Sequence, residues 1–371
     1  MKINVSNVNE LYDAVNDNAN IGATLVLAPG IYKLDENRPN KGRLELKENM
    51  ELQGQLGHPE KVVIDASGLK DASFESAGGF PPRTGAIRIG KGKNVIEELT
   101  VRGSSAPKAL SVIDSDLIGV GATHVIISHC IITGGRIGIN FRNISVPGVN
   151  RSIEAEIMNN ELTGNLISDA GTQQGQGIVF QNVNGASGAT IKATMKNNNI
   201  HHNIIGMRIF NNNSNAQTDN TSLIIVSKND MFDNNKLGIY ITGALNRALN
   251  APIDGNLIQF EAHGSSVREN KGIQQDIICM PCGIFVAGAI SMLAGSQSSN
   301  NKVEIKLTGC DVSGNQDTDI IAFGEFSTVP GSAGVNNVVE IELQGVSKKA
   351  RLTFPSQPPF PIDTNKVIVH E

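Results

Sequence analysis

The sequence is poor in aromatic and sulfur-containing side chains. It has no tryptophan, 3 tyrosines, 12 phenylalanines and 4 cysteines in 371 residues. Four cysteines, at positions 130, 279, 282 and 310, are too few for a disulfide-stapled scaffold. What is abundant instead is glycine, with 39 residues, together with isoleucine, valine and asparagine, and this composition favours strands and turns.

No charge of one sign dominates, and no apolar run is long enough to span a bilayer. The formal net charge is -5 with both signs scattered, so we expect no nucleic-acid partner and no membrane association. The start, Met-Lys-Ile-Asn-Val, lacks the apolar segment of a signal peptide. As written, the chain is expected in the cytoplasm, although an exported protein without its leader would look the same and be extracytoplasmic. The oligomeric state is not readable.

One short sequence motif, in which apolar and small polar residues alternate, recurs along the chain and indicates a repeat architecture. Aligning its copies gives three columns of like residues. The first column is aliphatic, and comprises Ile132, Leu162, Ile200, Met231, Val267 and Val312. The second holds small or amide side chains, Cys130, Asn160, Asn198, Asn229, Ser265 and Cys310. The third is all asparagine, Asn165, Asn203, Asn234, Asn270 and Asn315.

A glycine-led apolar strand follows the first five copies, beginning at Gly138, Gly177, Gly206, Gly238 and Gly283. The glycines are unequally spaced, which indicates a short coil with loops of variable length. Coils stacked about 4.8 Å apart would place equivalent residues in contact, with apolar ladders inside and asparagine ladders at the bends. Asparagine also tolerates the left-handed backbone of sharp turns, a role predicted for Asn143, Asn182 and Asn211 at the ends of these strands.

The sequence therefore predicts an all-β, single-stranded right-handed parallel β-helix forming one domain over residues 1–371. Residues 1–20 form an N-terminal cap, because Val8, Leu11, Tyr12 and Val15 have helical spacing and Asn7 with Glu10 forms a capping box. Residues 21–345 form the coils, and residues 346–371 form a proline-rich C-terminal tail.

The segment Leu25-Val26-Leu27-Ala28-Pro29-Gly30-Ile31-Tyr32 is similar to the entry strand of the right-handed β-helix repeat family, the pectate-lyase-like superfamily. The resemblance extends roughly from Val5 to Glu342, and no specific member is matched. It implies a groove on one parallel sheet that many members use to act on polysaccharides, while others only bind. Fold alone does not confer function.

If the glycine-led strands form one sheet, two outward columns face this groove. One column is Arg88, Ser111, Asn140, Val179, Arg208, Tyr240, Phe285 and Ile321, and its neighbour is Ile113, Arg142, Gln181, Phe210, Thr242, Ala287 and Phe323. In one interpretation the arginines pair with a substrate's carboxylates while the rings stack on sugars, which makes Asn140, Gln181, Phe210, Tyr240 and Phe285 substrate-binding residues. In the other, a loop covers this face.

The chemistry is less defined than the fold. The candidate catalytic residues are Arg142, Arg208 and Asp116, and the expected partner is an acidic oligo- or polysaccharide cleaved or epimerised by a lyase, hydrolase or epimerase. The alternative is a non-catalytic solenoid that binds a glycan, an apolar ligand or a protein. Asp114 aligns with Asn143 and Asn182, which favours a structural turn role.

No cofactor and no metal site are expected. The groove columns contain neither a trio of acids nor an acidic cluster for calcium, so calcium is left open but not indicated. The single pair Cys279 and Cys282 lacks the second pair of a zinc site. His201 and His202 lie at a bend with no carboxylate or third histidine at ligand spacing in the sequence.

Overall fold

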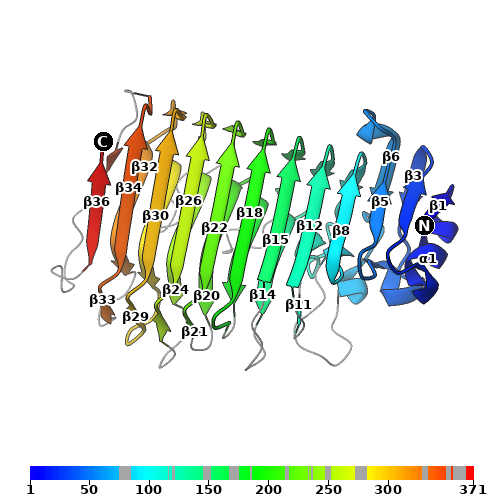
Figure 1. Ribbon diagram of the computed structural model, residues 1–371, viewed down its shortest axis with the longest axis horizontal. Helices are drawn as coiled ribbons and strands as arrows, with labels where there is room; N and C mark the ends of the chain where they lie inside the picture. Colours follow the sequence, from blue (N-terminus) through cyan, green and yellow to red (C-terminus); the bar gives the residue numbers. More distant parts are fainter. Residues whose placement is uncertain are drawn as a thin grey trace.

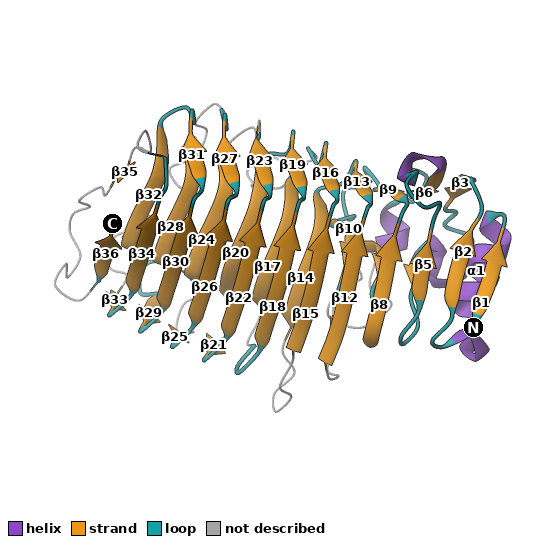
Figure 2. Cartoon of the chain, turned by 45° about the horizontal axis from the view of Figure 1, so that its top comes forward, coloured by secondary structure: helices purple, strands orange, loops and turns teal. Residues whose placement is uncertain are grey.

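The protein is an elongated stack of coils, one end of which carries its only α-helix among the described residues (Figures 1 and 2). The computed structural model describes residues 1–74, 85–115, 117–118, 122–144, 152–166, 175–183, 186–213, 217–232, 234, 237–246, 252–271, 282–327, 333–347, 352–353 and 365–371. Over these ranges, all strand pairs are parallel and each coil adds one strand to each wall in turn. This is a right-handed parallel β-helix, which confirms the predicted fold.

Three long sheets form the walls. Sheet A has 12 strands within the described residues: β1 (Lys2–Val5), β2 (Thr24–Leu27), β5 (Glu51–Gln53), β8 (Gly92–Glu97), β12 (Ala122–Ser128), β15 (Ser152–Met158), β18 (Thr190–Lys196), β22 (Thr221–Ser227), β26 (Leu257–His263), β30 (Lys302–Thr308), β34 (Val338–Gln344) and β36 (Lys366–His370). Sheet B comprises β3 (Gly30–Lys33), β6 (Val62–Asp65), β9 (Thr100–Arg102), β13 (Ile131–Thr133), β16 (Glu161–Thr163), β19 (Asn199–His201), β23 (Asp230–Phe232), β27 (Ser266–Arg268) and β31 (Asp311–Ser313).

Sheet C is built from the glycine-led strands. It comprises β4 (Leu44–Glu45), β7 (Gly85–Arg88), β10 (Ser111–Asp114), β11 (Leu117–Ile118), β14 (Ile137–Ile144), β17 (Gln176–Val183), β20 (Ile205–Asn213), β24 (Leu237–Asn246), β28 (Cys282–Ser291), β32 (Thr318–Ser327) and β35 (Leu352–Thr353). A small sheet D joins β21 (Gln217–Thr218), β25 (Ile253–Asp254), β29 (Gln297–Ser299) and β33 (Ala333–Val335) between sheets C and A.

The N-terminal cap is a helix that closes the first coil. Helix α1 (Val8–Asn16) buries Leu11, Tyr12 and Val15, and its contacts with β1, β3 and β4 place it over that coil. The Asn7 side chain accepts hydrogen bonds from the backbone N–H groups of Asn9 and Glu10, as the capping box predicts. Four 3₁₀ turns also lie near this end: η1 (Asn18–Asn20), η2 (Pro39–Gly42), η3 (Pro59–Lys61) and η4 (Asp71–Phe74). None of the helices within the described ranges has the length and apolar character needed to cross a membrane.

The interior contains the predicted aliphatic ladder. Ile132 pairs with Leu162, Leu162 with Ile200 and Ile200 with Met231, and the register continues to Val267 and Val312. All six side chains are buried in one continuous apolar cluster. Removal of these side chains from water along the whole axis is the main source of stability, because each coil covers the apolar face of the next.

The asparagine columns are hydrogen-bonded ladders, as expected. In the first, the backbone N–H and side-chain amide of Asn160 both donate to Oδ1 of Asn198, and Asn198 donates in the same way to Asn229. The ladder asparagines do not themselves take the left-handed backbone: the positive φ is at the preceding residue, for example Asn159 and Asn197. The preceding residue makes the turn. The side chain of each ladder asparagine is then free to accept a hydrogen bond from the buried backbone N–H of the equivalent residue in the adjacent coil.

Two details of the sheet C columns differ from expectation. Asn143 and Asn182 do not have positive φ; each donates its side-chain amide to the asparagine of the next strand, at 2.9 Å. The leading glycines are needed for space, because a Cβ on Gly206 would lie 2.7 Å from the carbonyl oxygen of Gly238.

The C-terminal end also differs from expectation. Residues 366–370, within the segment expected as a tail, form β36 of sheet A and pair with β34. Residues 354–364, with the four prolines, lie outside the described residues.

Candidate glycan-binding face

The outer face of sheet C carries the two predicted columns in almost the predicted register. Val179 pairs with Asn140 and with Arg208, and the column continues through Tyr240 to Phe285. In the neighbouring column, Arg142 pairs with Gln181, which pairs with Phe210. The fold therefore brings together seven of the eight predicted site residues from strands β14 to β28, and Asp116, the eighth, lies outside the described residues.

The register of β10 corrects two assignments. Asp114, and not Ser111, pairs with both Arg88 and Asn140, while Ile113 pairs with the inward Ile139. Asp114 is therefore a member of the first column and not a turn residue, and it is buried. The short β10 lacks the leading glycine by which the other strands were aligned, so its register was not readable from the sequence.

The aromatic half of this face is covered, which corrects the interpretation of an open stacking platform. Phe210, Tyr240, Phe285 and Phe323 are only 1–5 % exposed and belong to a second apolar cluster outside the main interior. Their rings stack on each other: the Tyr240 and Phe285 centroids lie 5.2 Å apart with nearly parallel planes. In these strands, the side chains that point inward and those that point outward are both apolar. Both faces of the sheet are therefore buried here, as is typical of parallel sheets.

The polar half forms a chain of hydrogen bonds across neighbouring strands. The Gln181 side-chain amide donates to Oδ1 of Asn140 at 2.7 Å, and the Asn140 amide donates to Oγ of Ser111 at 3.1 Å. Asn140 is fully buried, whereas Arg142 is partly exposed. Gln181 and Arg208 are 7 % and 8 % exposed, so Arg142 is the member of this half that solvent reaches most, and the amides beside it are held in fixed orientations.

Arg208 lies where the two halves meet. Its guanidinium is 4.1 Å from the ring centroid of Phe210 and 4.7 Å from that of Tyr240. The residue is 8 % exposed, and within the described part of the chain it makes no ion pair or hydrogen bond through its side chain. Cation–π contacts offset part of the desolvation of the charge, but a buried cation without an anionic partner is unfavourable. The site is thus preorganised for an anion, and a guanidinium suits a carboxylate.

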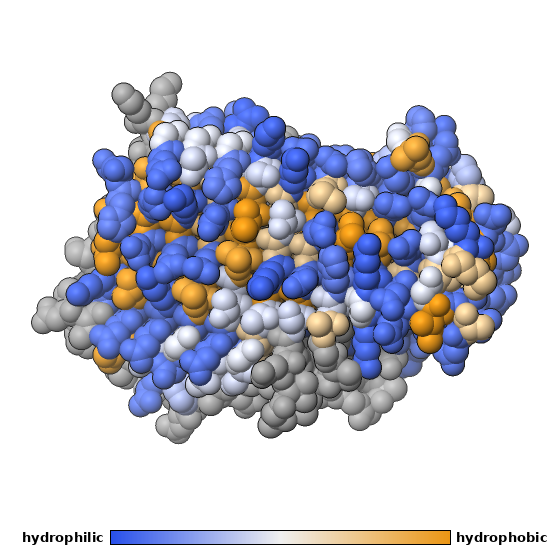
Figure 3. Space-filling view, in the orientation of Figure 1, coloured by the Kyte–Doolittle hydropathy of each residue, from blue (hydrophilic) through white to orange (hydrophobic). Residues whose placement is uncertain are grey.

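The other outer wall, sheet A, is exposed and mixed in character (Figure 3). A shallow hollow of ≈ 580 Å³ lies near its C-terminal end, lined by Lys302, Glu304 and Glu340 among others. There the Lys302 ammonium contacts Glu304 at 2.5 Å and Glu340 at 3.0 Å. The lysine lowers the pKa of Glu340, and the charges are mutually paired. Such a surface contributes little binding energy for a charged ligand.

The cysteines give no sign of redox or metal chemistry. Cys130 and Cys310 are buried in the ladder column, and burial raises the pKa of Cys130 to about 12. Cys282 is buried in the apolar cluster of sheet C, and Cys279 lies outside the described residues. Across the described ranges, no group of three or more His, Cys, Asp and Glu side chains is arranged to hold a metal ion.

No protein-family model and no curated protein sequence matches the chain. Among solved structures it is similar to the A-module of mannuronan C-5 epimerase AlgE6 from Azotobacter vinelandii, with 15 % identity over 99 % of this chain and 100 % of that one, at a TM-score of 0.36. The Dettilon tailspike protein is 12 % identical over 97 % of this chain and 64 % of that one, with a TM-score of 0.42. A mannuronic acid-specific polysaccharide family 6 lyase from human gut microbiota is 12 % identical over 97 % and 92 %, at 0.36.

The chain has a parallel β-helix fold. Its own strand order and register establish this, because three parallel sheets are extended by one strand per coil. The activity of a β-helix protein depends on the side chains that line its walls, and in this chain the polar and aromatic columns lie on the outer face of sheet C.

Proposed function

We propose that this β-helix binds an acidic polysaccharide along the polar half of the outer face of sheet C, with Arg208 contacting a carboxylate. The observation that carries the proposal is the guanidinium of Arg208, which is held between two rings and has no anionic partner among the described residues. A ligand carboxylate would supply the missing charge and accept two parallel hydrogen bonds.

The surrounding residues favour an extended, hydroxyl-rich ligand over a compact anion. Asn140, Gln181 and Arg208 lie on the consecutive strands β14, β17 and β20, so the polar groups extend over two rung spacings, roughly 10 Å. Amide groups both donate and accept hydrogen bonds, and Gln181, whose orientation is fixed by the buried Asn140, is the amide that could meet a sugar hydroxyl. Arg142, partly exposed on β14, provides a second cationic group two rungs from Arg208.

A second candidate function is cleavage or epimerisation of the bound glycan. It is favoured by the position of Asp114, a buried carboxyl group in register with Arg88 and Asn140 on the same outer face. Proton transfer by a carboxyl group near a bound sugar is the basis of several such reactions. Asp116 stays a predicted catalytic residue that the described residues do not include.

The test compares polyuronates with a neutral glycan, using the full chain and its variants. We expect the wild type to bind alginate or polygalacturonate in isothermal titration calorimetry and not to bind dextran. Arg208→Ala should weaken polyuronate binding about 10–100-fold, the loss expected for one charge-assisted bidentate contact. Arg208→Lys should recover only part, because an ammonium cannot reproduce the planar fork.

Arg268→Ala is the matched control, because Arg268 is already paired with Asp230 at 3.0 Å on sheet B. Its affinity for polyuronates should equal that of the wild type. Equal affinity of Arg208→Ala and wild type, or a preference for dextran, would refute the proposed site. Ultraviolet-absorbing or reducing products that disappear in Asp114→Asn would support cleavage, and a changed proton magnetic resonance spectrum of the recovered polymer would support epimerisation. Absence of both would leave a binding protein.

A further inference from the structure

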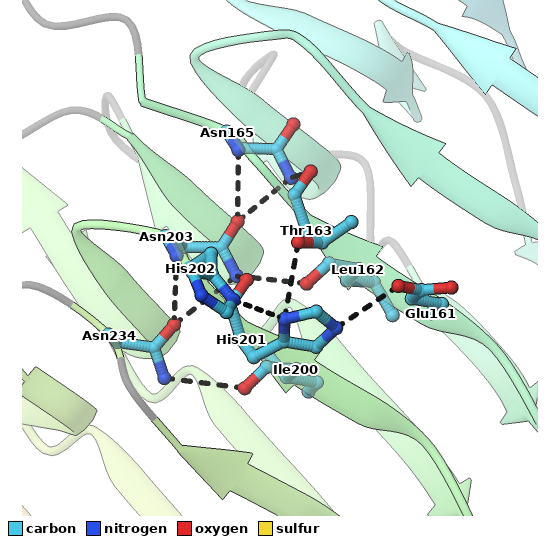
Figure 4. Close-up of polar contacts among 9 residues, drawn as sticks. All are labelled: Glu161, Leu162, Thr163, Asn165, Ile200, His201, His202, Asn203 and Asn234. Atoms are coloured by element: carbon cyan, nitrogen blue, oxygen red, sulfur yellow. Dashed lines mark hydrogen bonds and ion pairs between the residues drawn. The ribbon is translucent and has the colours of Figure 1, made fainter. Parts of the chain in front are cut away.

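Two adjacent histidines and a distant carboxylate meet at one corner of the β-helix (Figure 4). Nδ1 of His201 lies 2.5 Å from Nδ1 of His202, and the Thr163 hydroxyl lies 3.3 Å from the same His201 nitrogen. Nε2 of His201 is 3.1 Å from Oε1 of Glu161 on the preceding coil. The sequence offered no carboxylate at ligand spacing, whereas the stacking of β16 on β19 brings one across 40 residues.

The contacts determine how protons are shared in this group. The carboxylate of Glu161 accepts a hydrogen bond only if Nε2 of His201 carries the proton, so Nδ1 of a neutral His201 is a lone-pair acceptor. His202 then shares the proton of its own Nδ1 with that lone pair. The two Nδ1 atoms therefore converge on a single proton position.

We propose that His201 and His202 form a binding site for a divalent transition-metal ion such as Zn²⁺ or Cu²⁺, with Glu161 orienting His201. The ion takes the place of the shared proton, which moves through solvent to Nε2 of His202, so both rings stay neutral and both Nδ1 atoms bind the ion after a small separation of the rings. Imidazole nitrogen is a preferred ligand of these ions, and a carboxylate on the other ring nitrogen is their usual supporting partner. Water completes the coordination, because the His202 side chain is exposed.

The corner is built so that this pair stays in place. His202 has the left-handed backbone, with φ 52°, at a position where two other coils have Gly164 and Gly314. Another coil has Glu269 at this position, also with positive φ (56°), so the left-handed turn is a shared feature of the corner that fixes the backbone carrying the histidines. Immediately after it, the buried Asn203 bonds to Asn165 and Asn234 in the asparagine ladder, so the backbone carrying both rings is anchored.

The site is distinct from the proposed glycan contact but lies next to it along the chain. From His202 the chain turns at Asn203 and enters β20, the strand that carries Arg208. The metal proposal does not depend on glycan binding, because it rests on the histidine pair and Glu161 alone.

The experiment is titration of the full chain with Zn²⁺ by calorimetry and with Cu²⁺ by electron paramagnetic resonance. We expect one site per chain whose Cu²⁺ spectrum shows coupling to two imidazole nitrogens. The sharpest variant is His202→Gly, because glycine suits the positive φ and removes one ligand without disturbing the corner. It should bind metal at least about tenfold more weakly and show one coupled nitrogen; Glu161→Gln should weaken binding by about tenfold.

His263→Ala is the control, since His263 has a neighbouring carboxylate, Glu261 at 3.6 Å, on the outer face of sheet A but no adjacent histidine. It should bind as the wild type does. Unchanged affinity in a folded His202→Gly protein would overturn the site, as would the absence of any stoichiometric binding to the wild type. Unchanged affinity in Glu161→Gln would remove the role assigned to that carboxylate.

Discussion

The asparagine ladder at the corner between sheets B and C should be a major local source of stability, and Asn203→Ala tests this. Asn203 is fully buried. Its Oδ1 accepts from the backbone N–H of Asn165 at 3.1 Å and from the Asn165 amide at 3.0 Å. Its Nδ2 contacts the carbonyls of Leu162 at 2.9 Å and His201 at 3.0 Å, and Oδ1 of Asn234 at 3.3 Å. Truncation therefore removes a partner from five neighbouring groups, although Oδ1 of Asn234 keeps the backbone N–H of Asn203.

The expected loss of stability follows from the groups that lose this partner. A hydrogen bond contributes about 1 kcal/mol net, and a buried group left unpaired costs about 1–3 kcal/mol, so the variant should lose about 3–5 kcal/mol after local relaxation. A loss of this size exceeds that of most point substitutions, because the replaced side chain serves two neighbouring coils.

The assay is guanidinium unfolding followed by circular dichroism, together with hydrogen exchange of the backbone amides around Asn165. We expect a lower unfolding midpoint and faster exchange at that corner. Asn199→Ala is the control, because Asn199 is exposed and its side chain makes no hydrogen bond within the described residues; it should change stability by less than about 0.5 kcal/mol. A loss below about 1 kcal/mol for Asn203→Ala would refute the ladder as an energetic element.

Two further predictions concern sheet C. Burial raises the pKa of Glu325, which accepts hydrogen bonds from Ser291 and Asn365, above its ordinary value of 4.5. The folded state then holds the proton more tightly than the unfolded state, so this contribution to stability is complete below about pH 4.5 and is lost as pH rises through the raised pKa. Glu325→Gln should remove that dependence in denaturant unfolding at about pH 4 and about pH 8; an unchanged pH profile would contradict the argument. Gly206→Ala should lose about 1–3 kcal/mol, because its Cβ would meet the Gly238 carbonyl oxygen at 2.7 Å, and neutral behaviour in thermal unfolding would show that the strands can separate freely.

Much of the fold was predictable because the interactions that make it repeat in the sequence. Each coil must present an aliphatic residue to the coil beneath it, so Ile132, Leu162 and Ile200 appear as a column before any coordinates are known. The ladder asparagines are readable for the same reason. A fourth ladder, running through Asn220, Asn256, Asn301 and Asn337, was not recognised, because its members directly precede the sheet A strands, outside both of the aligned sequence motifs.

The candidate site was predictable only in part. Alternation along the glycine-led strands placed Asn140, Gln181 and Arg208 on one face correctly. Whether that face is open could not be derived, because Tyr240 and Phe285 have the same pattern whether they face solvent or lie under other residues. The register of Asp114 was also missed, since a four-residue strand carries too few side chains to define its own alignment.

The sequence by itself determined the coil, three of its ladders, its capping helix and most of the residues on the outer face of sheet C, because those depend on short-range periodicity and on contacts between equivalent positions. Only the tertiary structure decided which wall is covered, that Arg208 lies against two rings with no anion beside it among the described residues, and that Glu161 lies against His201. These outcomes depend on side-chain orientation and on what packs over each wall, and neither follows from the repeat of residue types along the sequence.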